Sequence, residues 1–163
     1  MLARSIAFTT IGLEAIRIDL EVDAARGLPA LTIVGLPDQA VKEARERVRS
    51  AILNSQFQLP SQRFVVNLAP ADLKKEGGVF DLAIALGLLA ASGQLDPARL
   101  AAVATLGELA LDGTLRPVRG VLPVKSVNGQ ALRYSPGPVT RRIVTLYREF
   151  LADWALPRGN SRL

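Results

Sequence analysis

Apolar and polar residues alternate along the first quarter of the chain, a pattern typical of strands that bury one face. The alternation runs over residues 4–11 and 14–25, where every second residue from Ile16 to Val22 is aliphatic. A glycine lies between the two stretches, so they predict a β-hairpin. A short apolar run at residues 31–34 predicts a third strand.

The spacing of apolar residues changes to a helical one after a turn at residues 35–38. Pro37 disfavours helical angles at the residue before it, and Asp38 is a residue type that caps helices. In residues 39–54 the aliphatic side chains recur three or four positions apart, at Val41, Ala44, Val48, Ala51 and Ile52. The pattern predicts a helix over 39–54 with one buried face and a charged outer face.

The middle of the chain predicts one more strand, a buried helix and a hairpin. Residues 63–69 are the strand, and residues 80–92 are almost uniformly apolar, which indicates a helix buried on most sides. Residues 101–111 and 114–118 flank Asp-Gly, a strong hairpin signal. This order predicts an α+β two-layer sandwich, a mixed sheet with helices on one face.

Charge is distributed unevenly along the chain. The net charge of the 163 residues is +5, yet residues 1–118 hold 12 Lys and Arg against 13 Asp and Glu. Residues 119–163 hold 8 against 2, so the basic character belongs to this last part. Here we expect a turn-rich linker at 128–138 and a basic amphipathic helix at 139–154. That helix either docks on its own domain or lies on a membrane or nucleic acid.

Composition and missing motifs exclude several functions. The chain has no cysteine and no histidine, so disulfides, thiolate or imidazole metal ligands and a Ser-His-Asp triad are excluded. The sequence contains no dense cluster of carboxylates that would predict a metal site. No apolar run approaches the ~18 residues of a membrane span, and no signal peptide is evident, so a cytoplasmic protein without membrane contact is expected. The P-loop pattern is absent, so this chain is not expected to hydrolyse ATP.

A lysine- and glycine-rich turn is the first candidate binding site. Lys74 and Lys75 precede Gly77 and Gly78 just before the buried helix. Lys75, Gly77 and Gly78 make this a candidate anion loop, because exposed N–H groups and a helix dipole suit a phosphate or carboxylate. The alternative is a tight turn with solvated lysines, in which Asp81 satisfies the same N–H groups.

The outer face of the helix at 39–54 is the second candidate. It carries Lys42, Glu43, Arg45, Glu46, Arg47 and Arg49. This face either contacts DNA or another subunit, or is a solvated surface laced with ion pairs. The spacing predicts the pairs Lys42–Glu46 and Glu43–Arg47.

Three strings carry a family resemblance: GLPDQAVKEARERVRSAILNS, VVNLAPADLKKEGGVFDLAIALGLLAASGQL and GELALDGTLRPVRGVLP. Over residues 1–124 the chain resembles the magnesium-chelatase-like AAA+ ATPases of the ComM/YifB type. The resemblance implies an N-terminal domain similar to ribosomal protein S5 domain 2 and to the Lon protease domain, ahead of an ATPase module that holds ATP and Mg²⁺. It also implies a ring-shaped DNA helicase of natural transformation. No cofactor is expected in this chain.

The likeness to Lon implies that the chain is not an enzyme. Lon-like peptidases have Lys-Asp-Gly-Pro-Ser where this chain has residues 75–79, so Val79 stands at the serine position. Leu122 stands at the lysine position, and a dyad needs both groups. The non-peptidase C-terminal domain of RadA is similar. The alternative is a divergent serine–lysine peptidase that uses Ser92 or Lys125.

The resemblance also divides the chain. Residues 1–124 are expected to form the domain, and residues 125–163 depart from the family, which we interpret as a truncated or shifted reading frame ahead of the ATPase. The expected role is a non-catalytic module that contacts DNA or neighbouring subunits, with the ring of a homo-oligomer built by the ATPase; a remnant without function is the other alternative. The candidate contact residues are Lys42, Arg45, Arg49, Lys74 and Lys75.

Overall fold

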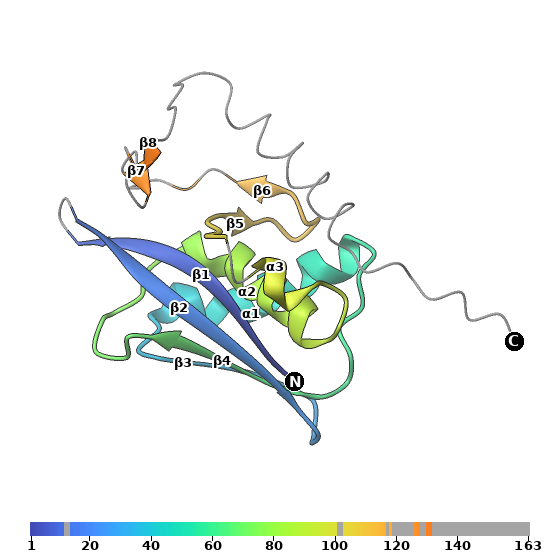
Figure 1. Cartoon of the computed structure of the whole chain (residues 1–163). Helices are drawn as coiled ribbons and strands as arrows, with labels where there is room; N and C mark the ends of the chain where they lie inside the picture. The colour runs from blue at the N-terminus through green and yellow to red at the C-terminus, as the bar shows by residue number, and fades with distance from the viewer. Residues whose placement is uncertain (12–13, 101–102, 117, 119–125, 128–129, 132–163) are drawn as a thin grey trace, which may run out of the picture.

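A four-stranded mixed sheet forms one layer of the protein. The computed structural model describes residues 1–11, 14–100, 103–116, 118, 126–127 and 130–131. The strands are β1 (Leu2–Ile11), β2 (Glu14–Ala25), β3 (Ala30–Val34) and β4 (Arg63–Ala69). Their order is β1-β2-β4-β3, antiparallel except for the parallel pair β3–β4 (Figure 1). The predicted hairpin and mixed sheet are confirmed.

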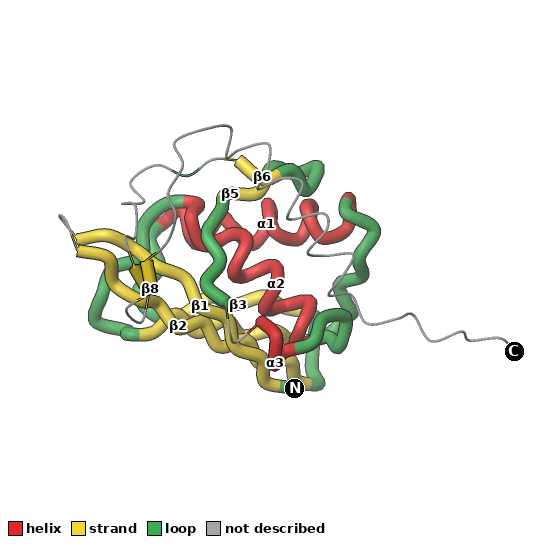
Figure 2. The backbone as a smooth tube through the Cα atoms, turned by 45° about the horizontal axis from the view of Figure 1, so that its top comes forward, coloured by secondary structure: helices red, strands yellow, loops and turns green. Residues whose placement is uncertain are grey.

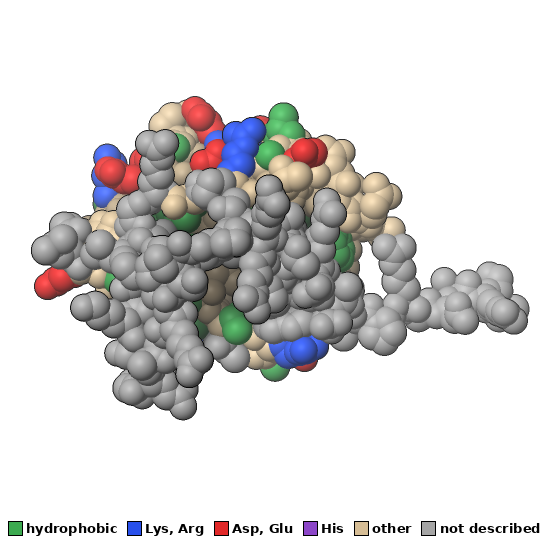
Figure 3. Space-filling model, turned by 90° about the horizontal axis from the view of Figure 1, so that it is seen from above, with side chains coloured by type: hydrophobic (Ala, Val, Ile, Leu, Met, Phe, Trp, Pro, Cys, Tyr) green, Lys and Arg blue, Asp and Glu red, His purple; other side chains and the backbone are tan. Residues whose placement is uncertain are grey.

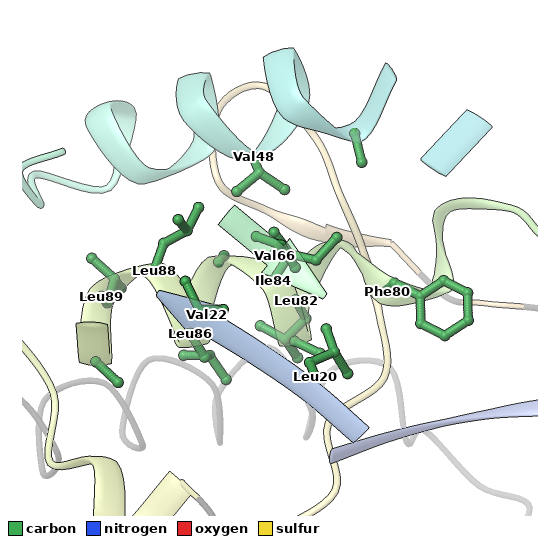
Figure 4. Close-up of a cluster of buried hydrophobic side chains, with 14 of the residues drawn as sticks. Leu20, Val22, Val48, Val66, Phe80, Leu82, Ile84, Leu86, Leu88 and Leu89 are labelled. Carbon is green, nitrogen blue, oxygen red and sulfur yellow. The ribbon is translucent and has the colours of Figure 1, made fainter. Parts of the chain in front are cut away.

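Two helices cover one face of this sheet, so the predicted α+β two-layer architecture is also confirmed. Helix α1 (Gln39–Asn54) and helix α2 (Asp81–Ala91) lie on the same side of the strands (Figure 2). All five aliphatic residues expected on the inner face of α1 are buried. Val48 of α1 points toward Val66 of β4 and Ile84 of α2 in the core (Figure 4).

Helix α2 is buried along its whole length, as its apolar sequence predicts. It lies so close to the sheet that one position has no room for a side chain. A Cβ on Gly87 would come 2.6 Å from Cγ2 of Val22 on β2. The hydroxyl of Ser5 on β1 donates a 3.1 Å hydrogen bond to the carbonyl of Ala83. Gly87 therefore lets the helix approach the strands closely.

The region around α2 differs from the prediction in its details. A 3-10 turn, η1 (Gly78–Phe80), precedes α2, and a short helix, α3 (Pro97–Leu100), follows it unpredicted. The hairpin is shorter than expected, with β5 (Glu108–Leu109) and β6 (Leu115–Arg116) as its arms. The long first arm at 101–111 is wrong because part of that segment bonds elsewhere: the Thr105 N–H donates to Ile6 of β1 over 2.8 Å.

The last described residues form a small pair, β7 (Ser126–Val127) with β8 (Gln130–Ala131), where a linker was expected from residue 128. The predicted helix at 139–154, Leu122 and Lys125 lie outside the described residues. Within the described ranges, no helix combines the length and apolar character that a membrane crossing needs.

Candidate nucleic-acid interface

Three cations form a row on the outer face of α1. Lys42, Arg45 and Arg49 are exposed, and their spacing of three and four residues puts them on one side of the helix over about 10 Å. The Arg45 Nε donates to the carbonyl of Lys42 over 3.1 Å. In the part of the chain that the structure describes, neither Lys42 nor Arg49 forms an ion pair. These groups are available to an external anion.

The two ion pairs expected along this face do not form among the described residues. Glu43 accepts a 3.0 Å hydrogen bond from Gln39 instead, and Glu46 has no ion-pair partner there. The three cations of the row therefore share the face with Glu43 and Glu46, a net charge of +1. On the face drawn in Figure 3, the visible blue and red side chains lie close to one another.

Arg47 faces the other way, toward Asp81 at the start of α2. Its Nε lies 3.0 Å from Oδ2 of Asp81, and a terminal nitrogen lies 3.1 Å from Oδ1. The Leu109 N–H donates to the same carboxylate over 3.2 Å. The hydrogen bond that Arg47 donates to Asp81 raises the pKa of Arg47. Burial raises the pKa of Asp81, because its desolvation outweighs the hydrogen bonds that favour the charged form. This ion pair fastens α1 to α2 and β5.

Asp81 therefore does not satisfy the N–H groups of the glycine turn, and that expectation is wrong. The carboxylate of Asp38 takes this role. Its Oδ1 accepts from the Val41 N–H over 2.7 Å, which caps α1 as predicted. Its Oδ2 accepts from the Gly77 N–H over 3.3 Å. One side chain thus caps a helix and holds the turn against it.

Lys75 lies in the interior, which corrects its expected place on a binding surface. Its side chain is 0% exposed, and its ammonium donates to the carbonyl of Pro70. Its backbone bonds to the turn before α1. The N–H of Lys75 donates to the carbonyl of Leu36 over 3.2 Å, and its carbonyl accepts from the N–H of Asp38 over 2.9 Å. Burial lowers the pKa of Lys75. In this conformation the ammonium reaches neither DNA nor an anion in the loop.

The remainder of the glycine turn is unfavourable for an anion. The Nζ of Lys74 is exposed but lies 2.7 Å from Oε1 of Glu76, and this hydrogen bond raises the pKa of Lys74. A Cβ on Gly78 would come within 2.9 Å of Glu108, so a carboxyl-bearing side chain lies against the turn. Gly77 has a φ of +78°, which explains the glycine. The turn thus has a structural role, because it is bonded to the segment before α1, and Lys74 is its outward-facing cation.

The position at which the resemblance to Lon implies a serine, residue 79, is part of the packing. Val79 is half-buried, and its carbonyl accepts from the Gly107 N–H over 3.0 Å. Ser92 donates to the carbonyl of Leu89 and accepts from Gln94, so its hydroxyl is bonded to a carbonyl and an amide, and no described base is bonded to it. Among the described residues, no three carboxylates gather as a metal site.

A cleft of about 340 Å³ opens beside the cation row, and the sequence did not reveal it. Arg45, Glu46 and Arg49 form one wall. The opposite side comes from the start of β3 and from the segment before β4, namely Pro29, Ala30, Leu31, Leu59, Pro60, Ser61, Gln62 and Phe64.

Two further arginines belong to the same corner of the fold. Arg63 pairs with both Ala25 and Ala30 across the sheet, and Arg26 directly follows Ala25. Both arginines are exposed and form no ion pair with a described residue. They stand alone in the sequence, and only the strand pairing places them at this end of the sheet, so sequence reasoning missed them. Arg63 alternates with the buried Phe64 along β4, so its side chain lies on the face of the sheet opposite the cleft.

The fold and this surface define an α+β domain whose outer helix offers cations without ion-pair partners among the described residues. Residues 20–132 match the model of the ChlI family, subunit ChlI of Mg-chelatase, and the chain belongs to this family. It is 54% identical over 114 residues to the competence protein ComM of Haemophilus influenzae and 55% identical over 112 residues to YifB of Salmonella typhimurium. An uncharacterized protein of Mycobacterium tuberculosis is 43% identical over 122 residues.

The matched segment is a limited part of these relatives. It covers 70% of this chain but 22% of ComM, and 75% of this chain but 24% of the mycobacterial protein. The expected resemblance to the magnesium-chelatase-like, ComM/YifB type is thereby confirmed.

Proposed function

We propose that this chain is a non-catalytic module of a ComM/YifB-like protein and that it contacts DNA through Lys42, Arg45 and Arg49, with Lys74 near the start of the same helix. The observation that carries the proposal is the row itself: Lys42 and Arg49 are exposed without ion-pair partners among the described residues, whereas Arg47 is held by Asp81. The name of one relative, a competence protein, supports a role in handling DNA.

Catalysis is assigned to other parts of such a protein. ATP and Mg²⁺ would be bound by the ATPase module that the family resemblance implies, and that module would also assemble the subunits into a ring. Val79 stands where the resemblance implies the peptidase nucleophile, and the described partners of the Ser92 hydroxyl are Leu89 and Gln94. Covalent labelling of the chain by a fluorophosphonate probe would contradict the non-catalytic assignment.

The charge balance of the helix face sets the expected mode of binding. Glu43 and Glu46 lie among the three cations, so the long-range attraction for a polyanion is small. Binding must come from individual contacts between cations and phosphates, which carry no base sequence information. We therefore expect weak, sequence-independent binding that decreases steeply with salt.

The test compares two variants that remove the same charge from different faces. The row variant is Lys42→Ala/Arg45→Ala/Arg49→Ala, and the matched control is Arg4→Ala/Arg17→Ala/Arg116→Ala. With a fluorescent duplex in low salt, we expect about a tenfold loss of affinity for the row variant and less than about twofold for the control.

Equal losses in both variants would contradict the assignment to this face, as would unchanged binding in the row variant. Sedimentation of the same proteins separates DNA contact from subunit contact. If the row variant changes the association state and leaves DNA affinity unchanged, the face contacts a neighbouring subunit instead.

A further inference from the structure

Strand β3 is a free edge of the sheet. At the opposite end, the segment around Thr105 bonds to β1, whereas β3 pairs only with β4 among the described residues (Figure 1). The sequence of β3, ALTIV, has no charge and no proline. Val34 is 40% exposed, and Leu28 and Leu36 beside the strand are 87% and 53% exposed. Natural proteins usually protect such an edge with charges, bulges or a covering segment.

The backbone groups that face outward can be assigned. The Ala30 N–H donates over 3.4 Å to Gln62, which precedes β4, so the polar groups of Ala30 point toward the sheet. Successive residues of a strand direct these groups to opposite sides, so Leu31 and Ile33 present their N–H and C=O groups to the free side. The edge thus offers two donors and two acceptors to an added strand.

The cleft described above opens at the N-terminal end of this edge and has the chemistry of a side-chain pocket. Its apolar surface comes from Leu31, Leu59 and Phe64. Arg45 and Arg49 stand on its other wall with a single acid, Glu46.

We propose that the β3 edge and this cleft bind an extended peptide segment that carries both apolar and acidic side chains at every second position, on the face that is turned toward the cleft. The peptide adds a strand through the main-chain groups of Leu31 and Ile33, and strand addition of this kind leaves specificity to pockets for alternate side chains. Apolar side chains enter the cleft, and carboxylates lie against Arg45 and Arg49.

This inference does not rest on the proposed DNA contact. Phosphates would use the arginines alone and would leave the uncharged edge and the apolar wall without a partner. A second copy of the chain would match the uncharged edge, but its own β3 carries no acidic side chain for the arginines of the cleft. An acidic, partly apolar peptide can bond to the β3 edge, pack against the apolar wall of the cleft and pair its carboxylates with Arg45 and Arg49.

The test uses synthetic peptides and the full chain. The probe is a fluorescein-labelled heptapeptide, Thr-Val-Thr-Glu-Thr-Val-Thr, in which valine and glutamate lie on one face of the strand and threonine lies on the other. Its first control has lysine in place of glutamate. Its second control is N-methylated at alternate residues on one edge, which removes main-chain donors but keeps every charge. We expect each control to bind about tenfold more weakly than the probe. Equal binding of the probe and the methylated peptide would overturn strand addition.

A variant and two further measurements complete the test. Leu31→Pro removes one outward N–H without taking a bond from the ladder to β4. It is expected to weaken probe binding about tenfold and to leave duplex DNA binding unchanged. Amide shifts on titration of the wild type are expected at Leu31 and Ile33, and shifts confined to α1 would overturn the proposal. So would a wild-type dimer that Leu31→Pro dissociates, because the edge would then be occupied by a second copy.

Discussion

At the scale of single residues, the sequence shows charges, but only the structure shows what each charge does. Arg45, Arg47 and Arg49 are neighbours on one helix, yet Arg47 alone reaches Asp81, which is 0% exposed. Lys74 and Lys75 are adjacent in the chain, yet one is exposed and the other is buried beneath Pro70. These assignments depend on contacts between segments that are distant in the sequence. Arg47 and Asp81, for example, are more than thirty residues apart.

The buried ion pair gives a prediction with a defined pH dependence. Arg47→Leu leaves Asp81 buried without its partner, which should cost about 3–5 kcal/mol of unfolding free energy at pH 7. The pKa of Asp81 is already raised by burial and rises further without Arg47. A raised pKa gives stability at low pH that is lost as pH increases through the folded value, so the deficit should shrink in mildly acid solution.

Urea unfolding at pH 5 and pH 7 measures both effects. The double variant Arg47→Leu/Asp81→Asn removes the isolated charge and should recover part of the loss at pH 7. A deficit of the single variant that is the same at both pH values would mean that the charge of Asp81 is not its cause.

For the buried Lys75, the unfolding free energy is expected to change with pH in the opposite direction. Its pKa is lowered by burial, so the unfolded chain binds the proton over a range in which the folded chain does not. Stability should therefore rise as pH increases from neutral toward the ordinary lysine value of about 10.4. Lys75→Met removes this contribution. The difference in unfolding free energy between wild type and variant should grow in favour of wild type between pH 7 and pH 9.5, and a constant difference would refute the buried, titrating role.

At the scale of elements, hydrophobic periodicity was sufficient wherever an element has one dry face. The bounds of β2, β4 and α1 agree with the prediction, because alternation or helical spacing continues to their ends. The prediction of a strand over residues 101–111 was wrong for a physical reason. Its apolar residues suit a strand, but the Gly107 N–H bonds to Val79 and the Thr105 N–H bonds to Ile6, so the hairpin begins only at Glu108.

The contact between α2 and β2 is tested by one methyl group. Alanine normally stabilises a helix relative to glycine, but a Cβ on Gly87 would lie 2.6 Å from Val22. Gly87→Ala should therefore destabilise the fold by about 1–3 kcal/mol. In a Val22→Ala background the same change should cost much less, because the methyl group that it meets is gone. Equal costs in the two backgrounds, measured by urea unfolding, would refute the steric explanation.

At the scale of the whole molecule, the family and the architecture were predictable and the surface was only partly so. The strings that carry the resemblance also contain Asp38, Lys75 and Gly77. The hydrogen bonds that Asp38 forms with Lys75 and with Gly77 could not be predicted from the sequence. The cation row on α1 followed from helical spacing. The cleft and the corner of Arg26 and Arg63 did not, because they arise where the ends of β2, β3 and β4 meet.

The central claim is that the row on α1 makes phosphate contacts, and the salt dependence of DNA binding tests it most directly. Each phosphate neutralised contributes a slope of about −0.9 to log K against log salt concentration on duplex DNA. If Lys42, Arg45 and Arg49 each contact one phosphate, the slope of the triple alanine variant should be smaller in magnitude than that of wild type by about 2–3. Identical slopes for the two proteins would contradict the account.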